Sequence, residues 1–164
     1  LEVLQKGYYS NKSGITNSGP TPPIVGTPTT YTITWELKNY FNDTKNAKIR
    51  AVLPQNVSLT GKVLPESEFL NFSFDNNSRE IVWNVSNGAP IIFGTGILSN
   101  APSISFQVTL VPDNSQKGST ASLISEASIT AEDQFTGSIA QSKSLPVNTS
   151  LPDDPSTLGG GIVQ

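Results

Sequence analysis

The 164-residue chain contains no cysteine and no histidine. Without cysteine, no disulfide can hold the fold; this is compatible with the cytosol or with a bacterial or archaeal exterior, whereas eukaryotic secreted modules of this size more often carry a bridge. Without histidine and cysteine, the chain cannot form a Ser–His–Asp triad, a thiol nucleophile or a His/Cys zinc site. We therefore expect a protein that is not an enzyme.

Charge is also scarce, at 14% of the residues against roughly 25% in an average soluble domain. The net charge is −3 and the ten Lys and Arg residues form no run, so we expect no nucleic-acid partner, because phosphate binding needs a concentrated basic face. No apolar stretch approaches the about 18 residues of a membrane span, so we expect no membrane contact by this fragment itself. The chain also lacks an initiator methionine and a signal peptide, so we expect any anchor to lie upstream.

The residues that replace charge are small and polar. Ser, Thr and Asn together number 51, and such residues suit exposed strands and turns better than helices. The organising stretch is 25–39, in which Tyr31, Ile33, Trp35 and Leu37 alternate with polar residues. This period of two is typical of a half-buried β-strand.

The same alternation recurs along the chain, with Gly, Pro, Asn and Asp between the repeats. It predicts strands near residues 47–53, 57–60, 103–111, 123–131 and 135–147, and a hairpin formed by 70–75 and 81–85. Seven to nine short strands predict an all-β fold, a two-sheet antiparallel immunoglobulin-like sandwich. Its predicted core contains Tyr31, Ile33, Trp35, Leu37, Phe72, Phe74, Trp83, Ile104, Phe106 and Val108.

Composition divides the chain into three segments. Residues 1–24 contain a short edge strand within 1–10 and a Pro- and Gly-rich linker. Residues 25–150 form the sandwich, in which the apolar Gly-rich loop 87–101 is expected to fold across one end of the core. Residues 151–164 are expected to form a tail that adds little to the core.

Four stretches carry a family resemblance: VGTPTTYTITWELKN, KNAKIRAVLPQNVSLTG, REIVWNV and APSISFQVTLVP. In this order they resemble the conserved-repeat domain of bacterial and archaeal cell-surface proteins, a domain of unknown function, over residues 25–149. With GYYS near the start and LPDDP before GIVQ, the chain looks closest to C-terminal modules of uncharacterised candidate-phylum bacterial surface proteins. The resemblance implies an immunoglobulin-like fold and an extracellular location, and it transfers no catalytic residues. Loop 87–100 is longer than the turn usual in the family.

Calcium is one cofactor that the acidic turns could hold. Oxygen ligands are offered by Asp153 and Asp154, by Asp75 with Asn77, by Asn42 with Asp43 and by Glu132 with Asp133. Calcium needs six to eight oxygens, and no stretch has the spacing of an EF-hand loop. The alternative is that these residues cap turns. We expect no other cofactor and no other metal.

Two covalent modifications are also considered. A Lys–Asn isopeptide cross-link could join Lys6 to Asn148 beside Glu126, although all three lie in polar contexts that favour solvated side chains. N-glycosylation could occur at seven of the fourteen asparagines, each of which precedes x-Ser/Thr: Asn11, Asn42, Asn56, Asn71, Asn76, Asn84 and Asn148.

Binding residues are sought among exposed aromatic and acidic side chains. Tyr8, Tyr9, Tyr40 and Phe41 lie in predicted loops or strand ends, where they could stack on sugars, anchor a partner, or simply close the ends of the sandwich. Glycoside hydrolysis would need two acids held across a cleft, and the pair Glu66 and Glu68 implies no cleft.

Three functions remain open. The first is a non-catalytic structural or spacer module of an extracellular surface protein. The second is an adhesive or ligand-binding domain that uses loops 11–28 and 87–101. The third is a filament subunit in which strand 1–10 pairs with a neighbour's sheet edge. In each case the expected partners are neighbouring domains or subunits of the same surface assembly.

Overall fold

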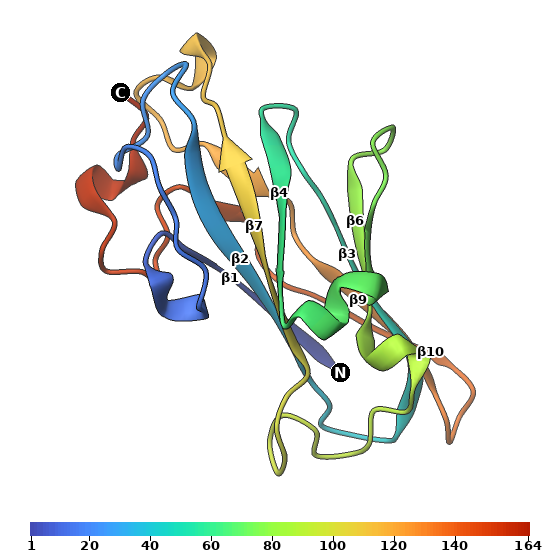
Figure 1. Ribbon diagram of the computed structural model, residues 1–164. Helices are drawn as coiled ribbons and strands as arrows, with labels where there is room; N and C mark the ends of the chain where they lie inside the picture. Colours follow the sequence, from blue (N-terminus) through green and yellow to red (C-terminus); the bar gives the residue numbers. More distant parts are fainter.

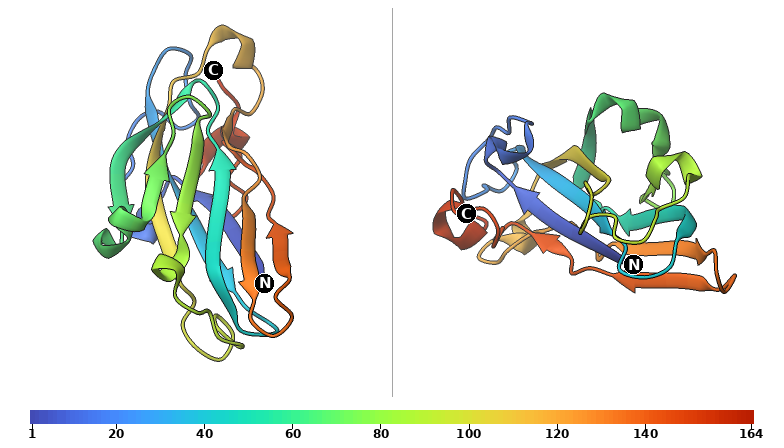
Figure 2. Two further views of the ribbon diagram at one scale, coloured as in Figure 1. Left: turned by 90° about the vertical axis from the view of Figure 1, so that its right-hand side faces the viewer. Right: turned by 90° about the horizontal axis from the view of Figure 1, so that it is seen from below.

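The computed structural model describes residues 1–164, except for the side chain of Leu158. Two antiparallel sheets face each other as two layers (Figure 1, Figure 2). The four-stranded sheet has the order β1 (Glu2–Tyr8), β2 (Thr29–Lys38), β7 (Ser103–Leu110) and β4 (Val57–Leu64). The five-stranded sheet has the order β10 (Ile139–Lys143), β9 (Ser128–Asp133), β3 (Thr44–Val52), β6 (Glu80–Asn84) and β5 (Phe72–Phe74).

The smaller elements lie around these layers. A short pair joins β11 (Val147–Asn148) to β8 (Ser122–Ile124). The described residues also contain five 3₁₀ turns: η1 (Asn11–Ser13), η2 (Glu66–Asn71), η3 (Val85–Gly88), η4 (Asn114–Gln116) and η5 (Leu158–Gly161). The prediction of an all-β, antiparallel, immunoglobulin-like sandwich is confirmed, with nine strands in the two main sheets. In the part of the chain that is described, no helix is long and apolar enough to cross a membrane.

The core is built on β2, which lies between β1 and β7. Trp35 is fully buried and meets the ring of Phe106 edge-on, with centroids 5.0 Å apart. Eight of the ten residues assigned to the core from the sequence are buried: Tyr31, Ile33, Trp35, Leu37, Trp83, Ile104, Phe106 and Val108. Phe72 and Phe74 are only half-buried, because β5 is a three-residue edge strand.

The alternation is misleading at Leu70, the first residue of the predicted strand 70–75. Residues 66–71 instead form η2, and Leu70 is 92% exposed. This turn supplies a hydrogen-bond acceptor for Trp83, because the Trp83 indole Nε1–H donates to Glu68 Oε2 at 2.8 Å. A buried indole needs such an acceptor, and apolar alternation alone does not reveal it.

Two other strand boundaries differ from the expectation. β4 continues to Leu64, beyond the predicted range 57–60, through a shift of register between Leu59 and Val63. The last strand, expected over 135–147, is divided between β10 and Val147, the first residue of β11, and Phe135 and Leu145 are exposed. β10 is an edge strand with a neighbour on one side only, so fewer of its side chains are covered.

Both terminal segments pack against the sandwich. β1 pairs with β2 along its whole length, from Glu2 opposite Lys38 to Tyr8 opposite Thr32. The tail was expected to add little to the core, and this is wrong for Leu151 and Val163, which are both buried in it. The division into segments 1–24, 25–150 and 151–164 stays a prediction.

Candidate functional site

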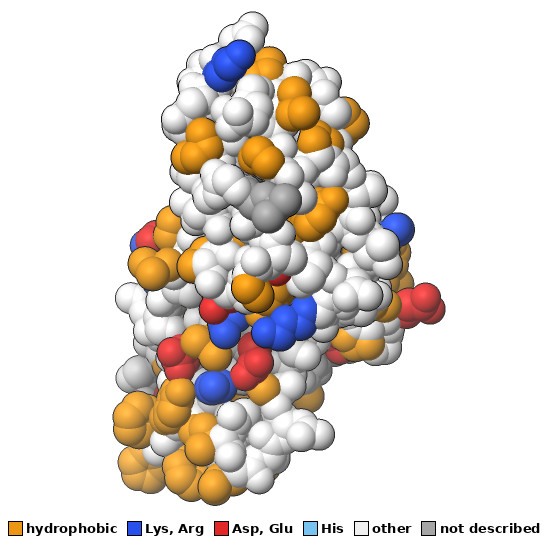
Figure 3. All heavy atoms as spheres, turned by 90° about the vertical axis from the view of Figure 1, so that its left-hand side faces the viewer, with side chains coloured by type: hydrophobic (Ala, Val, Ile, Leu, Met, Phe, Trp, Pro, Cys, Tyr) orange, Lys and Arg blue, Asp and Glu red, His pale blue; other side chains and the backbone are white. Residues whose placement is uncertain are grey.

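Exposed aromatic side chains gather at one end of the sandwich, in the loops at the lower end of Figure 1. A groove of about 640 Å³ is lined there by residues from three connections, and we call this surface the aromatic end: Tyr40, Phe41, Asn42, Asp43, Phe93, Gln134 and Phe135. Figure 3 shows hydrophobic side chains gathered at the same lower end. The arrangement can bury apolar surface of a partner.

Hydrogen bonds hold the loops of the aromatic end in place. The buried Asn39 amide donates to the carbonyls of Asn42, Ile91 and Ile92 at 2.9, 3.0 and 3.3 Å. Asp43 Oδ1 accepts the backbone N–H of Phe93 at 2.7 Å, which ties the β2–β3 loop to the β6–β7 loop. The rings are thus displayed on a fixed frame, which lowers the entropy lost when a partner binds.

Asp133 anchors the third connection. Its Oδ1 accepts the backbone N–H groups of Phe135 and Thr136 at 2.8 and 2.9 Å, and its Oδ2 accepts the Asn42 amide at 2.9 Å. Hydrogen bonds from the Thr136 backbone and from the Asn42 side chain lower the pKa of Asp133. The carboxylate is therefore ionised and committed to the turn, rather than available as an acid or base.

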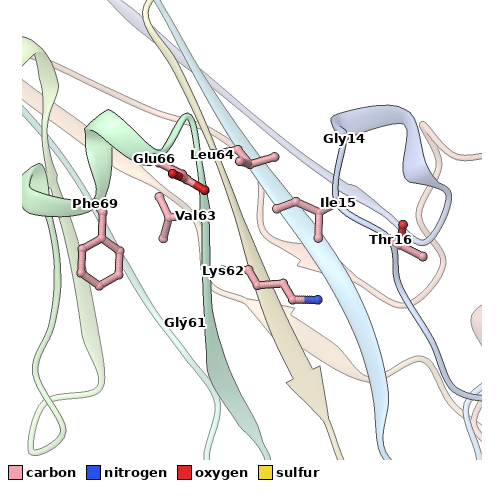
Figure 4. A pocket seen from close by; sticks show the side chains of 9 residues that line it. All are labelled: Gly14, Ile15, Thr16, Gly61, Lys62, Val63, Leu64, Glu66 and Phe69. Carbon is pink, nitrogen blue, oxygen red and sulfur yellow. The ribbon is translucent and has the colours of Figure 1, made fainter.

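A second groove of about 670 Å³ lies between β4, η2 and loop 14–16 (Figure 4). Its lining is mixed: Gly14, Ile15, Thr16, Gly61, Lys62, Val63, Leu64, Glu66 and Phe69. Lys62 and Glu66 are its two charged side chains. Glu68, the other half of the acidic pair considered for hydrolysis, is instead bonded to Trp83 and to the Asn71 amide. The groove thus presents no pair of acids from that stretch.

The acidic side chains considered for calcium are engaged in hydrogen bonds and ion pairs. Asp75 accepts the Asn77 N–H and the Ser78 hydroxyl, and Asp154 accepts the N–H groups of Tyr9 and Ser10. Asp153 pairs with Lys6, while Glu132 pairs with Lys45. Among the described residues, no three His, Cys, Asp or Glu side chains converge to hold a metal. Calcium stays a prediction.

Of the three residues considered for an isopeptide bond, Lys6 and Asn148 line the same small pocket, but each of the three has another partner. Lys6 lies 3.6 Å from Asp153, Glu126 pairs with Lys143, and Asn148 Oδ1 accepts from Ser150. Each side chain is solvent-accessible and paired with another residue, whereas such a bond would need a buried Lys and Asn beside a carboxylate. The cross-link stays a prediction.

The seven sequons differ in exposure. Asn11, Asn42, Asn76 and Asn148 are exposed, whereas Asn56, Asn71 and Asn84 are half-buried. The amides of Asn56 and Asn71 donate to Gln116 and Glu68. Glycosylation stays a prediction, and the exposed group offers the more accessible amides.

The aromatic residues predicted to bind separate into two groups. Tyr8 is buried, and Tyr9 packs on Tyr31 with centroids 6.1 Å apart, so both close the sandwich. Tyr40 and Phe41 belong to the aromatic end, where the Tyr40 hydroxyl donates to Glu2. Sequence reasoning missed Phe93 and Phe135 as binding residues. Their signal was a large apolar residue next to turn-forming Gly94 or Thr136–Gly137.

Comparisons with known proteins concern the fold alone. No family model and no curated protein sequence matches the chain. Among solved structures, a variant of the major pilin subunit BcpA of Bacillus cereus is similar over 90% of this chain and 39% of its own, at 15% identity and a TM-score of 0.48. The major pilin SpaD of Corynebacterium diphtheriae is similar over 90% of this chain and 35% of its own, at 15% identity and a TM-score of 0.47. The Actinomyces fimbrial adhesin FimA is similar over 95% of this chain and 53% of its own, at 11% identity and a TM-score of 0.36. The chain thus spans well under two thirds of these proteins.

Proposed function

We propose that the chain is a non-catalytic structural module of an extracellular cell-surface protein and keeps its two ends at a fixed separation. The observation that carries this proposal is the position of the termini. Glu2 lies opposite Lys38 at the last residue of β2, whereas Gln164 is bonded to Pro23 and Val25, just before β2 begins. Figure 1 accordingly has the N-terminus low and the C-terminus high.

The N-terminal attachment is made by a complete strand. β1 contributes buried Val3 to the core, and Gln5 accepts the Trp35 indole N–H at 2.7 Å. The Gln5 amide also donates to the carbonyls of Ser125 and Leu145, both at 2.9 Å, so it reaches segments beyond its own sheet. The β1–β2 pairing, the buried Val3 side chain and the Gln5 hydrogen bonds together hold the N-terminal end in one position on the sandwich.

The C-terminal attachment is made by the tail. Val163 is buried and its N–H donates to the Ser119 carbonyl at 2.9 Å, while the Gly118 N–H donates back to the Val163 carbonyl at 2.9 Å. The buried Thr149 hydroxyl donates to the Gly161 carbonyl at 2.6 Å. The second end therefore joins the same rigid body as the first.

The spacer proposal is tested by measuring the distance between the ends. Because the chain lacks cysteine, Leu1→Cys and Gln164→Cys introduce two unique sites for spin labels. The ten residues of β2 span about 3.3 Å each, so the two labels should lie about 30 to 40 Å apart. Double electron–electron resonance spectroscopy should then give one narrow distribution of label-to-label distances. A broad or bimodal distribution would contradict a fixed spacer. A single-label sample sets the background.

Strand donation by residues 1–10 is the alternative with the most definite structural cost. It would break the β1–β2 ladder, expose Val3 and leave the Trp35 indole without its acceptor. Hydrogen exchange of the isolated chain distinguishes the two functions. A structural module should protect the β1 amides that donate to β2, whereas in a donor strand these same amides should exchange orders of magnitude faster.

A further inference from the structure

The aromatic end holds more than half of the exposed large hydrophobic side chains of the described residues. Fourteen large hydrophobic side chains are exposed among the described residues, and eight of them lie in or beside its three connections: Tyr40, Phe41, Ile92, Phe93, Ile97, Leu98, Phe135 and Ile139. Phe41 is 74% and Phe135 is 87% exposed. Such a concentration marks an interaction surface, because single exposed apolar residues are normally scattered.

The exposed area at this end matches one half of a protein–protein interface. At roughly 100 Å² for each partly exposed side chain, the eight residues present about 800 Å². The largest apolar patch of a typical monomer covers about 300–600 Å², and each partner of a standard interface contributes about 800 Å². The surface is therefore large enough for a specific dimer.

The shape of the aromatic end suits a second copy of itself. It combines two highly exposed rings, Phe41 and Phe135, with a shallow, open groove of about 640 Å³ that they help to line. A surface that carries both a projection and a recess can pair with itself about a two-fold axis, because each copy fills the recess of the other.

The charged side chains at this end are few, and its lysines are paired. Lys38 pairs with Glu36, and Lys45 pairs with Glu132. The carboxylates of Glu2, Asp43 and Asp133 hold internal hydrogen bonds. The donors of these hydrogen bonds are neutral, and none of the three carboxylates is in an ion pair among the described residues, so they leave a modest negative charge at this end.

We propose that two copies of the chain dock through their aromatic ends in a two-fold symmetric, end-to-end contact. This contact is independent of the spacer function, because it requires only the folded module. A broad distance distribution between the two termini would therefore not argue against it. Since both copies bring the same three carboxylates to the contact, added salt should screen their repulsion and strengthen the association.

Sedimentation velocity over a concentration series tests the dimer. The wild-type chain should pass from monomer to dimer, more readily in 0.5 M than in 0.05 M NaCl. The double variant Phe41→Ser/Phe135→Ser should weaken dimerisation about a hundredfold or more, because it removes the two protruding anchors. The matched control Leu70→Ser/Leu145→Ser removes two equally exposed apolar residues elsewhere and should dimerise as the wild type does.

Circular dichroism should show both double variants folded, because all four positions are exposed. A wild-type chain that stays monomeric up to about millimolar concentration, where even weak specific complexes form, would overturn the proposal. A dimer unaffected by the Phe41/Phe135 variant would overturn it as well.

A cross-linking experiment tests the symmetry. Gln134→Cys at the aromatic end should be joined to itself by a short bis-maleimide, because a two-fold contact brings equivalent positions together. Lys117→Cys, which directly follows η4 in the connection from β7 to β8, should not be joined to itself. Efficient joining of Gln134→Cys to Lys117→Cys in a mixture would mean a head-to-tail contact and would overturn the two-fold arrangement.

Discussion

At the scale of single residues, stability depends on whether buried polar atoms find partners. The two tryptophans donate their indole N–H groups to side chains from other segments, Trp35 to Gln5 and Trp83 to Glu68. The buried Tyr31 hydroxyl has no hydrogen-bond partner in the described part of the chain. The sequence predicted that these three rings are buried, but alternation holds no information on their polar partners, which come from distant positions.

The Gln5 bridge gives a first prediction. Gln5→Leu should lower the free energy of unfolding by about 1–3 kcal/mol, because it leaves the Trp35 indole and two carbonyls unpaired. Tyr31→Phe is the control: it removes a hydroxyl that bonds to no described protein atom and should leave stability unchanged or raise it. Urea unfolding followed by tryptophan fluorescence measures both, and equal losses in the two variants would refute the assignment.

Asp154 gives a second prediction, on acid stability. Burial raises its pKa, but hydrogen bonds from Ser156, Ser10 and Tyr9 outweigh burial and hold the pKa at about 2. The carboxylate therefore stabilises the fold above its unfolded pKa of 3.8, and this contribution of about 2 kcal/mol is lost as the pH falls from about 4 to 2.

The Asp154→Asn variant isolates that contribution. It should be about 2 kcal/mol less stable at pH 7 and lose less stability than the wild type between pH 4 and 2. The other carboxylates with lowered pKa, such as Asp75 and Asp133, titrate in both proteins and cancel in the difference. Parallel pH profiles for the two proteins would contradict the role of Asp154.

At the scale of elements, alternation succeeds where a strand has neighbours on both sides. β2 and β7 are interior strands, and their apolar residues are buried as predicted. At the margins the same pattern is ambiguous: Leu70 alternates with Phe72 and Phe74, yet it lies in η2. The tail escaped prediction because Leu151 and Val163 are isolated apolar residues without periodicity, and only the tertiary fold brings them to the core.

Two adjacent glycines of the tail give a third prediction. A Cβ atom at Gly161 would lie 1.8 Å from the Thr149 carbonyl oxygen, whereas one at Gly160 would meet nothing within 4 Å. Gly161 and Gly160 both have positive φ, +70° and +59°. An alanine at either position therefore carries a similar backbone strain of about 1–2 kcal/mol. Gly161→Ala should therefore cost at least about 2 kcal/mol more than Gly160→Ala.

Urea unfolding and limited proteolysis measure the difference between the glycine variants. In Gly161→Ala the tail should be cleaved early, because the clash with backbone cannot be relieved by turning a side chain. Equal stability and equal cleavage of the two variants would show that the tail does not depend on this close approach.

At the scale of the whole molecule, the architecture was predictable and the candidate site only in part. Turn signals and alternation were sufficient for a two-sheet sandwich, and exposed Tyr40 and Phe41 were recognised as candidates. Phe93 and Phe135 lie about 50 and 90 positions further along, and only the strand order brings their loops to the same end. The same topology separates the termini, which no local pattern specifies.

Single-molecule pulling tests whether the two ends of the chain are fixed to opposite ends of one rigid sandwich. A pull between Leu1 and Gln164 loads β1 along its length, so the whole β1–β2 ladder must shear at once. A pull between Leu1 and Lys38, which are neighbours at one end, peels β1 away one hydrogen bond at a time. If both ends are fixed, the rupture force should be severalfold higher for the pull between Leu1 and Gln164. Equal forces, or a lower force between the termini, would contradict this.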